Sequence, residues 1–141
     1  MRTTRTVRLV SVVFAAASLV ASCSKSSTTG TLPKSCAVTG SHVRLVARNV
    51  VFQQRCLGVT ADAPFTIDFV NEDAGTAHNV VVYGPSTAAS DGAKRFDGKV
   101  ITGSSRTTYR VPALPAGSYV FRCEIHPAQM SGRLTVGPAS G

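Results

Sequence analysis

The sequence lacks the features that mark several large classes of protein. Its 141 residues contain no GxGxxG motif, no P-loop and no internal repeat, so nothing indicates a nucleotide-binding α/β domain or a repeat architecture. No basic cluster is interleaved with aromatic side chains, which argues against nucleic-acid binding even though the formal net charge is +8. Helix-type periodicity is almost absent. The chain is long enough for one small domain, and its 43% hydrophobic content is enough to form a single core.

Patterns of common catalytic sites are missing as well. Asp68, Glu72, Asp73 and Glu124 do not form a spaced pair typical of acid–base catalysis, and no Ser-His-Asp pattern emerges. The Cys-x-x-Cys-His run that attaches haem is also absent. We therefore expect a protein that is not an enzyme.

The N-terminal segment predicts export. Arg2, Arg5 and Arg8 precede an apolar run over residues 9–21, which is too short for a comfortable bilayer span and is typical of a secretory signal. The letters VASC at residues 20–23 are similar to the bacterial lipobox, where lipoprotein precursors are acylated and cut. We expect residues 1–22 to be removed after secretion by the Sec route, leaving a lipidated Cys23 at the outer face of the cell membrane. The alternative is plain secretion, with Cys23 a spare thiol.

The next residues predict a tether before the folded domain. Residues 24–35 are mostly polar, rich in Ser, Thr and Gly, and lack apolar periodicity, which is typical of a flexible linker. We assign residues 23–41 to the tether and residues 42–141 to a single domain. Without the three signal arginines, 12 basic residues face 7 acidic ones, so the remaining charge of +5 favours anionic surfaces only weakly.

The cysteines divide into a pair and a remainder. If Cys23 carries lipid, three thiols are left in an oxidising compartment, where two are expected to pair. Cys36 and Cys56 flank the first strand-like region and are the natural disulfide, although two buried free thiols are the alternative. Cys123 is then left over, and a bound metal would protect it from oxidation.

Short runs of β-forming residues separated by Gly and Pro predict the fold class. Residues 65–69 alternate apolar and polar side chains as a half-buried strand does. Further strands are expected at residues 43–47, 50–52, 77–83, 99–102, 107–111, 118–123 and 132–136, with an irregular stretch, able to hold one helical turn, over residues 84–98. Seven or eight short strands indicate an all-β, antiparallel sandwich or barrel.

Metal-binding side chains gather near the end of the chain. Strand parity places Tyr119, Phe121 and Cys123 on one face, and His126 and Met130 follow on a loop. Upstream, His78 shares the parity of a buried strand. Zinc prefers Cys, His and carboxylate ligands to a thioether, whereas two imidazoles, a thiolate and a weak axial thioether suit a blue-copper site. A Cys–His hydrolase would leave Met130 and the second histidine without a role.

These residues resemble the pattern of the small cupredoxins, the plastocyanin, pseudoazurin and amicyanin family, over about residues 43–136. The matching positions are His78 with Asn79, then Tyr119, Phe121, Cys123, His126 and Met130. The resemblance implies a Greek-key β-sandwich, one type 1 copper ion, a monomer, and electron transfer between redox partner proteins at the membrane surface. It also implies that Asn79 ties the His78 strand to the Cys123 loop, and that His126 is the electron port through a rim including Pro127 and Ala128.

The spacing before Met130 departs from the best-known relatives. Three residues separate His126 from Met130, against four in plastocyanin-like loops and two in amicyanin-like ones. Gln129 is a conceivable oxygen donor instead, and Met130 could be only an apolar plug. Electron transfer is our main functional hypothesis. The alternatives are a copper storage, delivery or resistance protein without redox turnover, and a structural β-sandwich whose ligand set stays empty. His42, before the first strand, is expected to be a surface residue.

Overall fold

A computed structural model describes residues 31–85 and 92–138. The expected signal peptide, the expected lipidation site Cys23 and the tether up to residue 30 lie outside the described residues. The described part forms eleven strands: β1 (His42–Arg48), β2 (Val51–Phe52), β3 (Cys56–Thr60), β4 (Phe65–Asn71), β5 (Ala77–His78), β6 (Val81–Tyr83), β7 (Lys94–Asp97), β8 (Ile101–Thr102), β9 (Ser105–Val111), β10 (Gly117–Arg122) and β11 (Ser131–Gly137).

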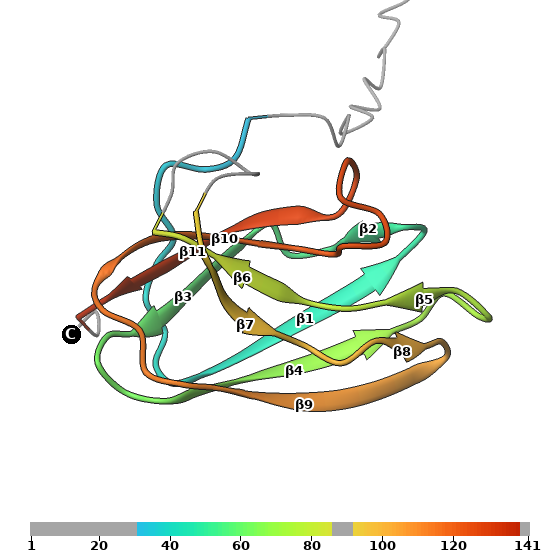
Figure 1. Ribbon diagram of the computed structural model, residues 1–141, viewed down its shortest axis with the longest axis horizontal. Coiled ribbons are helices and arrows are strands. Elements are labelled where there is room, and N and C mark those ends of the chain that lie inside the picture. Colours follow the sequence, from blue (N-terminus) through green and yellow to red (C-terminus); the bar gives the residue numbers. More distant parts are fainter. Residues whose placement is uncertain (1–30, 86–91, 139–141) are drawn as a thin grey trace, which may run out of the picture.

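Two sheets build a sandwich. One has the strand order β2-β1-β4-β9 and the other β3-β11-β10-β6-β7, while β5 and β8 form a short ribbon at one end (Figure 1). The alternation expected for residues 65–69 is present, because Phe65, Ile67 and Phe69 are buried and face the core. Tyr119, Phe121 and Leu134 fill the core from the opposite sheet. The predicted all-β sandwich is confirmed.

The sheets are mixed rather than purely antiparallel. β1 pairs in parallel with β4, and β3 pairs in parallel with β11. The physical reason is that the chain crosses to the other sheet as β3 between β1 and β4, so β4 returns in the direction of β1. The other pairings between the named strands are antiparallel.

The strand count exceeds the expected seven or eight for two reasons. The strand expected over residues 77–83 is interrupted and forms β5 and β6, while β2 and β8 fall within the strands expected at residues 50–52 and 99–102. β3 contains Gly58, an unfavourable strand residue, and β7 falls within the stretch expected to be irregular. Residues 94–97 of that stretch are extended, and its residues 86–91 lie outside the described part.

Packing begins before the expected domain start at residue 42. Cys36 and Val38 are each 9% exposed, and the predicted disulfide between Cys36 and Cys56 is present. The Cys36 N–H donates to Thr135 Oγ1 over 2.8 Å, and the Thr60 N–H donates to the Gly40 carbonyl over 3.0 Å. Residues 36–40 therefore form a strap, blue in Figure 1, that is fixed to β3 and β11.

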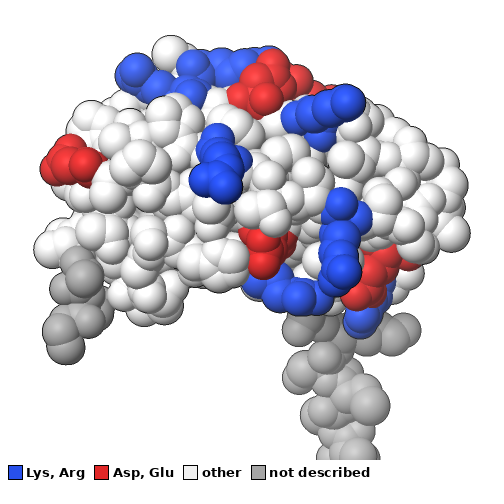
Figure 2. All heavy atoms as spheres, turned by 90° about the horizontal axis from the view of Figure 1, so that it is seen from below, with Lys and Arg blue, Asp and Glu red and all other residues white. Residues whose placement is uncertain are grey.

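The charged side chains are interspersed. Seen from below the view of Figure 1, Lys and Arg alternate with Asp and Glu instead of forming one basic patch (Figure 2). Arg48 pairs with Glu72 and Lys94 with Asp97, which neutralises part of the positive charge locally. No helix long and apolar enough to cross a membrane occurs in residues 31–85 and 92–138.

Candidate metal centre

Cys123 lies where a buried strand face reaches the end of the sandwich. Tyr119, Phe121 and Cys123 are at most 1% exposed and belong to one core cluster, as strand parity predicts. The thiol follows β10 directly and is the one free cysteine among the described residues. It is therefore held rigidly at the base of the loop that joins β10 to β11.

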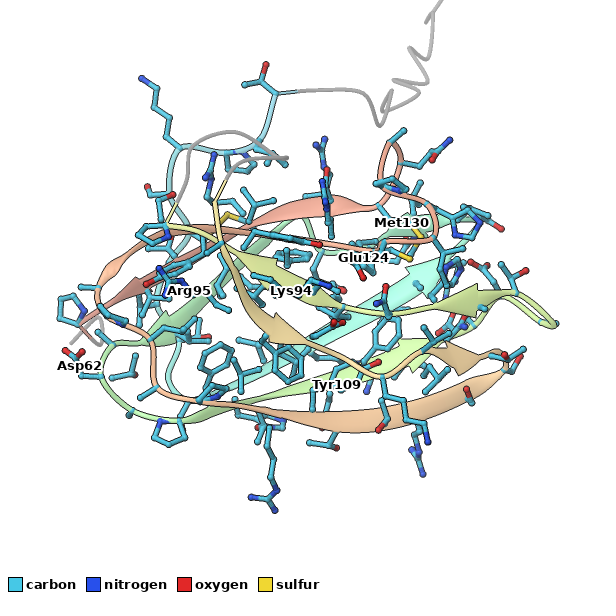
Figure 3. All side chains as sticks on the ribbon, in the orientation of Figure 1. Asp62, Lys94, Arg95, Tyr109, Glu124 and Met130 are labelled. Atoms are coloured by element: carbon cyan, nitrogen blue, oxygen red, sulfur yellow. A yellow bond between two sulfur atoms is a disulfide. The ribbon has the colours of Figure 1, made fainter. Side chains whose placement is uncertain are left out.

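This loop closes on itself through its backbone. The Cys123 N–H donates to the Met130 carbonyl over 2.9 Å, and the Met130 N–H donates to the His126 carbonyl over 3.0 Å. Met130 is fully buried at the end of the sandwich that holds the loop (Figure 3), whereas Gln129 is exposed. The three-residue gap thus still places a buried thioether in the same loop as the thiol and the imidazole.

His78 brings the second imidazole from a distant part of the sequence. It ends β5, which lies at the same end of the molecule as the β10–β11 loop (Figure 1), and it is fully buried. Its Nδ1 lies 3.8 Å from Cys123 Sγ and 3.2 Å from Nδ1 of His126. The donor atoms of the three side chains all lie within 4.8 Å of one another.

The donor set fits a copper ion. Metal–nitrogen bonds are about 2.0 Å long and metal–sulfur bonds about 2.3 Å. One ion can therefore bind both His78 Nδ1 and Cys123 Sγ, which are 3.8 Å apart, or both His78 Nδ1 and His126 Nδ1, which are 3.2 Å apart. Two imidazoles and a thiolate suit either copper or zinc, but a thioether in the same loop is a ligand that copper accepts and zinc rarely uses. The carboxylate nearest to His78 belongs to Asp73, and it contacts the other ring nitrogen, Nε2, rather than the side of the ring that faces Cys123.

Asp73 is a part of this centre that sequence reasoning missed. Its Oδ2 lies 2.9 Å from His78 Nε2, and only 12% of its side chain is exposed. The residue follows β4 in a segment where three acidic residues occur within six positions, so its spacing alone did not distinguish it. The signal that could have found it is that a metal-binding histidine usually donates its second N–H to a carboxylate or carbonyl.

Backbone donors hold the Asp73 carboxylate in its charged form. Burial by itself would raise the pKa of Asp73, but hydrogen bonds from the Val50 N–H, the His78 ring and the Asn49 N–H outweigh it and lower that pKa. Asn49 N lies 2.5 Å from Oδ1, and Val50 N lies 2.9 Å from Oδ2. The turn between β1 and β2 is thereby linked to the buried histidine.

Asn79 forms a hydrogen bond to the segment that contains Cys123. Its side chain is 3% exposed, and its Oδ1 accepts a hydrogen bond of 2.9 Å from the Glu124 N–H. This bond joins the segment that follows His78 to the residue that follows Cys123. The segment that carries His78 and the segment that carries Cys123 are thus joined by this bond as well as through the core.

Polar side chains cover the outer side of the Cys123 segment. Glu124 accepts a hydrogen bond of 2.5 Å from the Tyr83 hydroxyl and pairs with Lys94 at 2.9 Å, and both contacts lower the pKa of Glu124. Glu124, in the loop after β10, and Lys94, in β7, lie close together in Figure 3. The Arg122 guanidinium lies 4.3 Å from the centre of the Tyr83 ring.

His42 is separate from this centre. Its side chain is 62% exposed, and it contacts Thr66 and Asp68 on the outside of the sheet that contains β1 and β4. The interpretation of His42 as a surface residue is confirmed.

Comparison with known proteins supports the fold described above. A family model described as a cupredoxin-like domain matches residues 11–136. Reduced auracyanin from Roseiflexus castenholzii is similar in structure, with a TM-score of 0.60 and 20% identity over 71% of this chain and 99% of that one. Auracyanin A from Chloroflexus aurantiacus, a "blue" copper protein, gives a TM-score of 0.58 and 20% identity over 70% and 99%. At this identity the two likenesses show the fold.

A larger copper protein contains a similar region. The Cu-containing nitrite reductase from Thermus scotoductus matches with a TM-score of 0.51 and 25% identity, over 70% of this chain and 23% of its own length. Comparison with curated protein sequences finds no match.

Proposed function

Because the chain belongs to the cupredoxin-like family, we propose that it is an electron-transfer protein that binds one type 1 copper ion through His78, Cys123, His126 and Met130. The observation that carries the proposal is the convergence of one buried thiol and two imidazole Nδ1 atoms within 4.8 Å. A bound copper ion would supply one-electron exchange between Cu(II) and Cu(I). In this proposal the protein is a carrier rather than an enzyme, and the similarity to the nitrite reductase concerns only 23% of that chain.

The scaffold supports this role because it fixes the donors before metal binding. His78 and Cys123 are fully buried, and each is anchored to a different strand of the sandwich. The loop bonds between Cys123, His126 and Met130 restrict the remaining donors. Donors that move little when the charge of the site changes keep the reorganisation small, which favours fast electron transfer.

His126 is the proposed electron port. It is partly exposed, unlike His78, and the apolar residues Ile125, Pro127 and Ala128 beside it are exposed. Ile125 is 44% exposed, and only one other large hydrophobic side chain of the described residues, Val100, is comparably open. An apolar rim around a partly exposed ligand is a suitable contact surface for a transient redox partner protein.

Copper titration tests the proposal. Adding Cu(II) to the purified domain should produce an intense blue or green thiolate-to-copper absorption, which Cys123→Ser should abolish. His42→Gln is the matched control, because it removes an exposed imidazole outside the centre and should leave the absorption unchanged. A wild-type protein that stays colourless with Cu(II) would rule out the type 1 site.

The same preparation separates electron transfer from copper storage, delivery or resistance. Burial of His78, Cys123 and Met130 favours retention of the ion over its release to an acceptor. An electron carrier should keep its copper through repeated reduction and reoxidation in the presence of a Cu(I) chelator. Rapid loss to the chelator on reduction would favour copper delivery instead.

We also propose that the mature protein is a monomer tethered to the outer face of a bacterial membrane through lipidated Cys23. The support is the basic and apolar N-terminal segment, followed by VASC at residues 20–23 and a polar linker. Cells that express the full chain should incorporate labelled fatty acid into it and retain it in the membrane fraction. Cys23→Ser should lose the label and release the protein, and Cys36→Ser is the control that keeps the label.

A further inference from the structure

We propose that Asp73 is a positioning residue for His78, and that its carboxylate biases the copper site toward Cu(II). The inference rests on the proposed function, because it assigns a role to Asp73 only in a site that binds copper through His78. It goes beyond the ligand set, since the carboxylate acts on the metal through the imidazole and does not bind it.

The first step is the choice of ring nitrogen. A carboxylate only accepts hydrogen bonds, so the nitrogen that lies 2.9 Å from Asp73 Oδ2, His78 Nε2, is the one that carries the proton. Nδ1 is then left with its lone pair, and this is the atom that faces Cys123 Sγ and His126 Nδ1. Asp73 therefore presents His78 to the metal in the tautomer that can bind it.

The second step is the rigidity of Asp73 itself. The carboxylate accepts the N–H groups of Asn49 and Val50, which form the two-residue turn between β1 and β2. Both residues have positive φ, 56° and 58°, a conformation that is unfavourable for a β-branched residue such as Val50. That turn aims two adjacent N–H groups at one side chain. Because two backbone donors fix the carboxylate, the His78 ring cannot turn without losing its hydrogen bond to Asp73.

The third step is electrostatic. Reduction of copper removes one positive charge from the site, so a fixed negative charge nearby stabilises Cu(II) more than Cu(I). Only 12% of the Asp73 side chain is exposed, which limits screening by water. The nearby cation, Arg48, is paired with Glu72 at 2.5 Å. The carboxylate should therefore increase the affinity for Cu(II) relative to Cu(I).

Asp73→Asn is the central test, and Asp68→Asn is its matched control. Asparagine keeps the shape of the side chain and can still accept from Nε2, but it lacks the charge. Asp68 precedes Asp73 by five residues, and its carboxylate contacts His42 and Thr108 on the outside of the sheet rather than a copper ligand. Cu(II) and Cu(I) affinities are measured by chelator competition, and the reduction potential by voltammetry.

Asp73→Asn should weaken Cu(II) binding about 10- to 100-fold, the usual effect of losing an outer partner of a metal-binding histidine. Cu(I) binding should weaken less, so the reduction potential should rise. Each tenfold difference between the two affinities corresponds to about 59 mV for one electron. Asp68→Asn should change neither. Equal loss of both affinities, with an unchanged potential, would reduce Asp73 to a structural residue and overturn the proposal.

A measurement on the wild-type apoprotein needs no variant. Nitrogen NMR of the imidazole groups should show His78 protonated at Nε2 and unprotonated at Nδ1. The opposite tautomer would overturn the positioning role, even if Asp73→Asn failed to fold. A wild-type protein without thiolate-to-copper absorption would instead contradict the proposed function, and the tautomer would still decide whether Asp73 orients His78.

Discussion

The ring of Phe121 on β10 packs against the backbone of Gly132, its direct partner on β11. A Cβ atom placed on Gly132 would lie 2.1 Å from the Cζ atom of Phe121, and Phe121 is fully buried beneath it. Gly132→Ala should therefore destabilise the domain by about 1 to 3 kcal/mol, because the ring must leave its favoured position in a packed core. Urea unfolding of the wild type and the variant measures the difference.

Gly137 on the same strand provides the control. A Cβ atom placed on Gly137 would meet its nearest neighbour, an atom of the Val38 side chain, at 3.6 Å, which is an ordinary contact. Gly137→Ala should change the free energy of unfolding by no more than about 0.5 kcal/mol. Similar losses in both variants would show that the Phe121 contact is not the cause.

The disulfide should contribute to stability without affecting the metal centre. Cys36 and Cys56 are 20 residues apart, and a cross-link over that distance stabilises the folded state by about 3 kcal/mol through restriction of the unfolded chain. Replacing both cysteines by serine should lower the free energy of unfolding by about that amount. The copper absorption of the variant should stay the same, because Cys123 is not part of the bridge. Loss of the absorption would mean that the strap is needed to hold the site.

Met130→Leu separates a ligand from an apolar plug. Leucine fills a similar buried volume but offers no sulfur, and copper should still bind through the three stronger donors. If Met130 is the axial ligand, the absorption spectrum should shift and the reduction potential should rise, because a donor to Cu(II) is lost. Spectroscopy and voltammetry on the same samples measure both. An unchanged spectrum and potential would leave Met130 as a packing residue.

Alkaline pH should destabilise the domain through its tyrosines. Burial, together with the Cys123 charge, raises the pKa of Tyr109, and burial also raises the pKa values of Tyr83 and Tyr119. In the unfolded chain tyrosine ionises near pH of about 10, so above that pH the folded state holds more protons and its stability falls as pH rises. The stability that comes from these raised tyrosine pKa values is fully present below pH of about 10.

Tyr109→Phe tests this pH dependence. The variant loses the hydrogen bond of 2.6 Å from the Tyr109 hydroxyl to the Lys99 carbonyl, so it should be less stable near neutral pH by about 1 kcal/mol. Its stability should fall less steeply than that of the wild type above pH of about 10. Urea unfolding at several pH values measures both slopes, and parallel curves would contradict the assignment to Tyr109.

Much of the candidate centre could be predicted because its signals are local. Cys123 and His126 are three residues apart, and the parity of one strand is enough to direct Cys123 into the core. His78 was included because it shares the parity of a buried strand and supplies the second imidazole of a blue-copper donor set. Asp73 could not be found in this way, because its role depends on a turn 23 residues earlier that points two N–H groups at it. No pattern in the sequence around Asp73 encodes that distant contact.

The fold class could be predicted, but not the pairing of its strands. Alternation within residues 65–69 reports which face of a strand is buried and nothing about its neighbours. The parallel pairs β1–β4 and β3–β11 result from the order in which the chain visits the two sheets. Val38 and Cys36 were assigned to the tether because isolated apolar residues in a polar segment carry no periodic signal.

The pairing of β3 with β11 has a consequence for the order of folding. β3 and the strap find their partners in the last described strand, and the bond from the Cys36 N–H to Thr135 spans 99 residues. Contacts this distant in sequence require costly loop closure, so they form late and slow the search for the native state. A nascent chain that ends before β11 leaves the edge of its second sheet open. The second sheet is therefore complete only after β11 has been synthesised and has paired with β3 and β10.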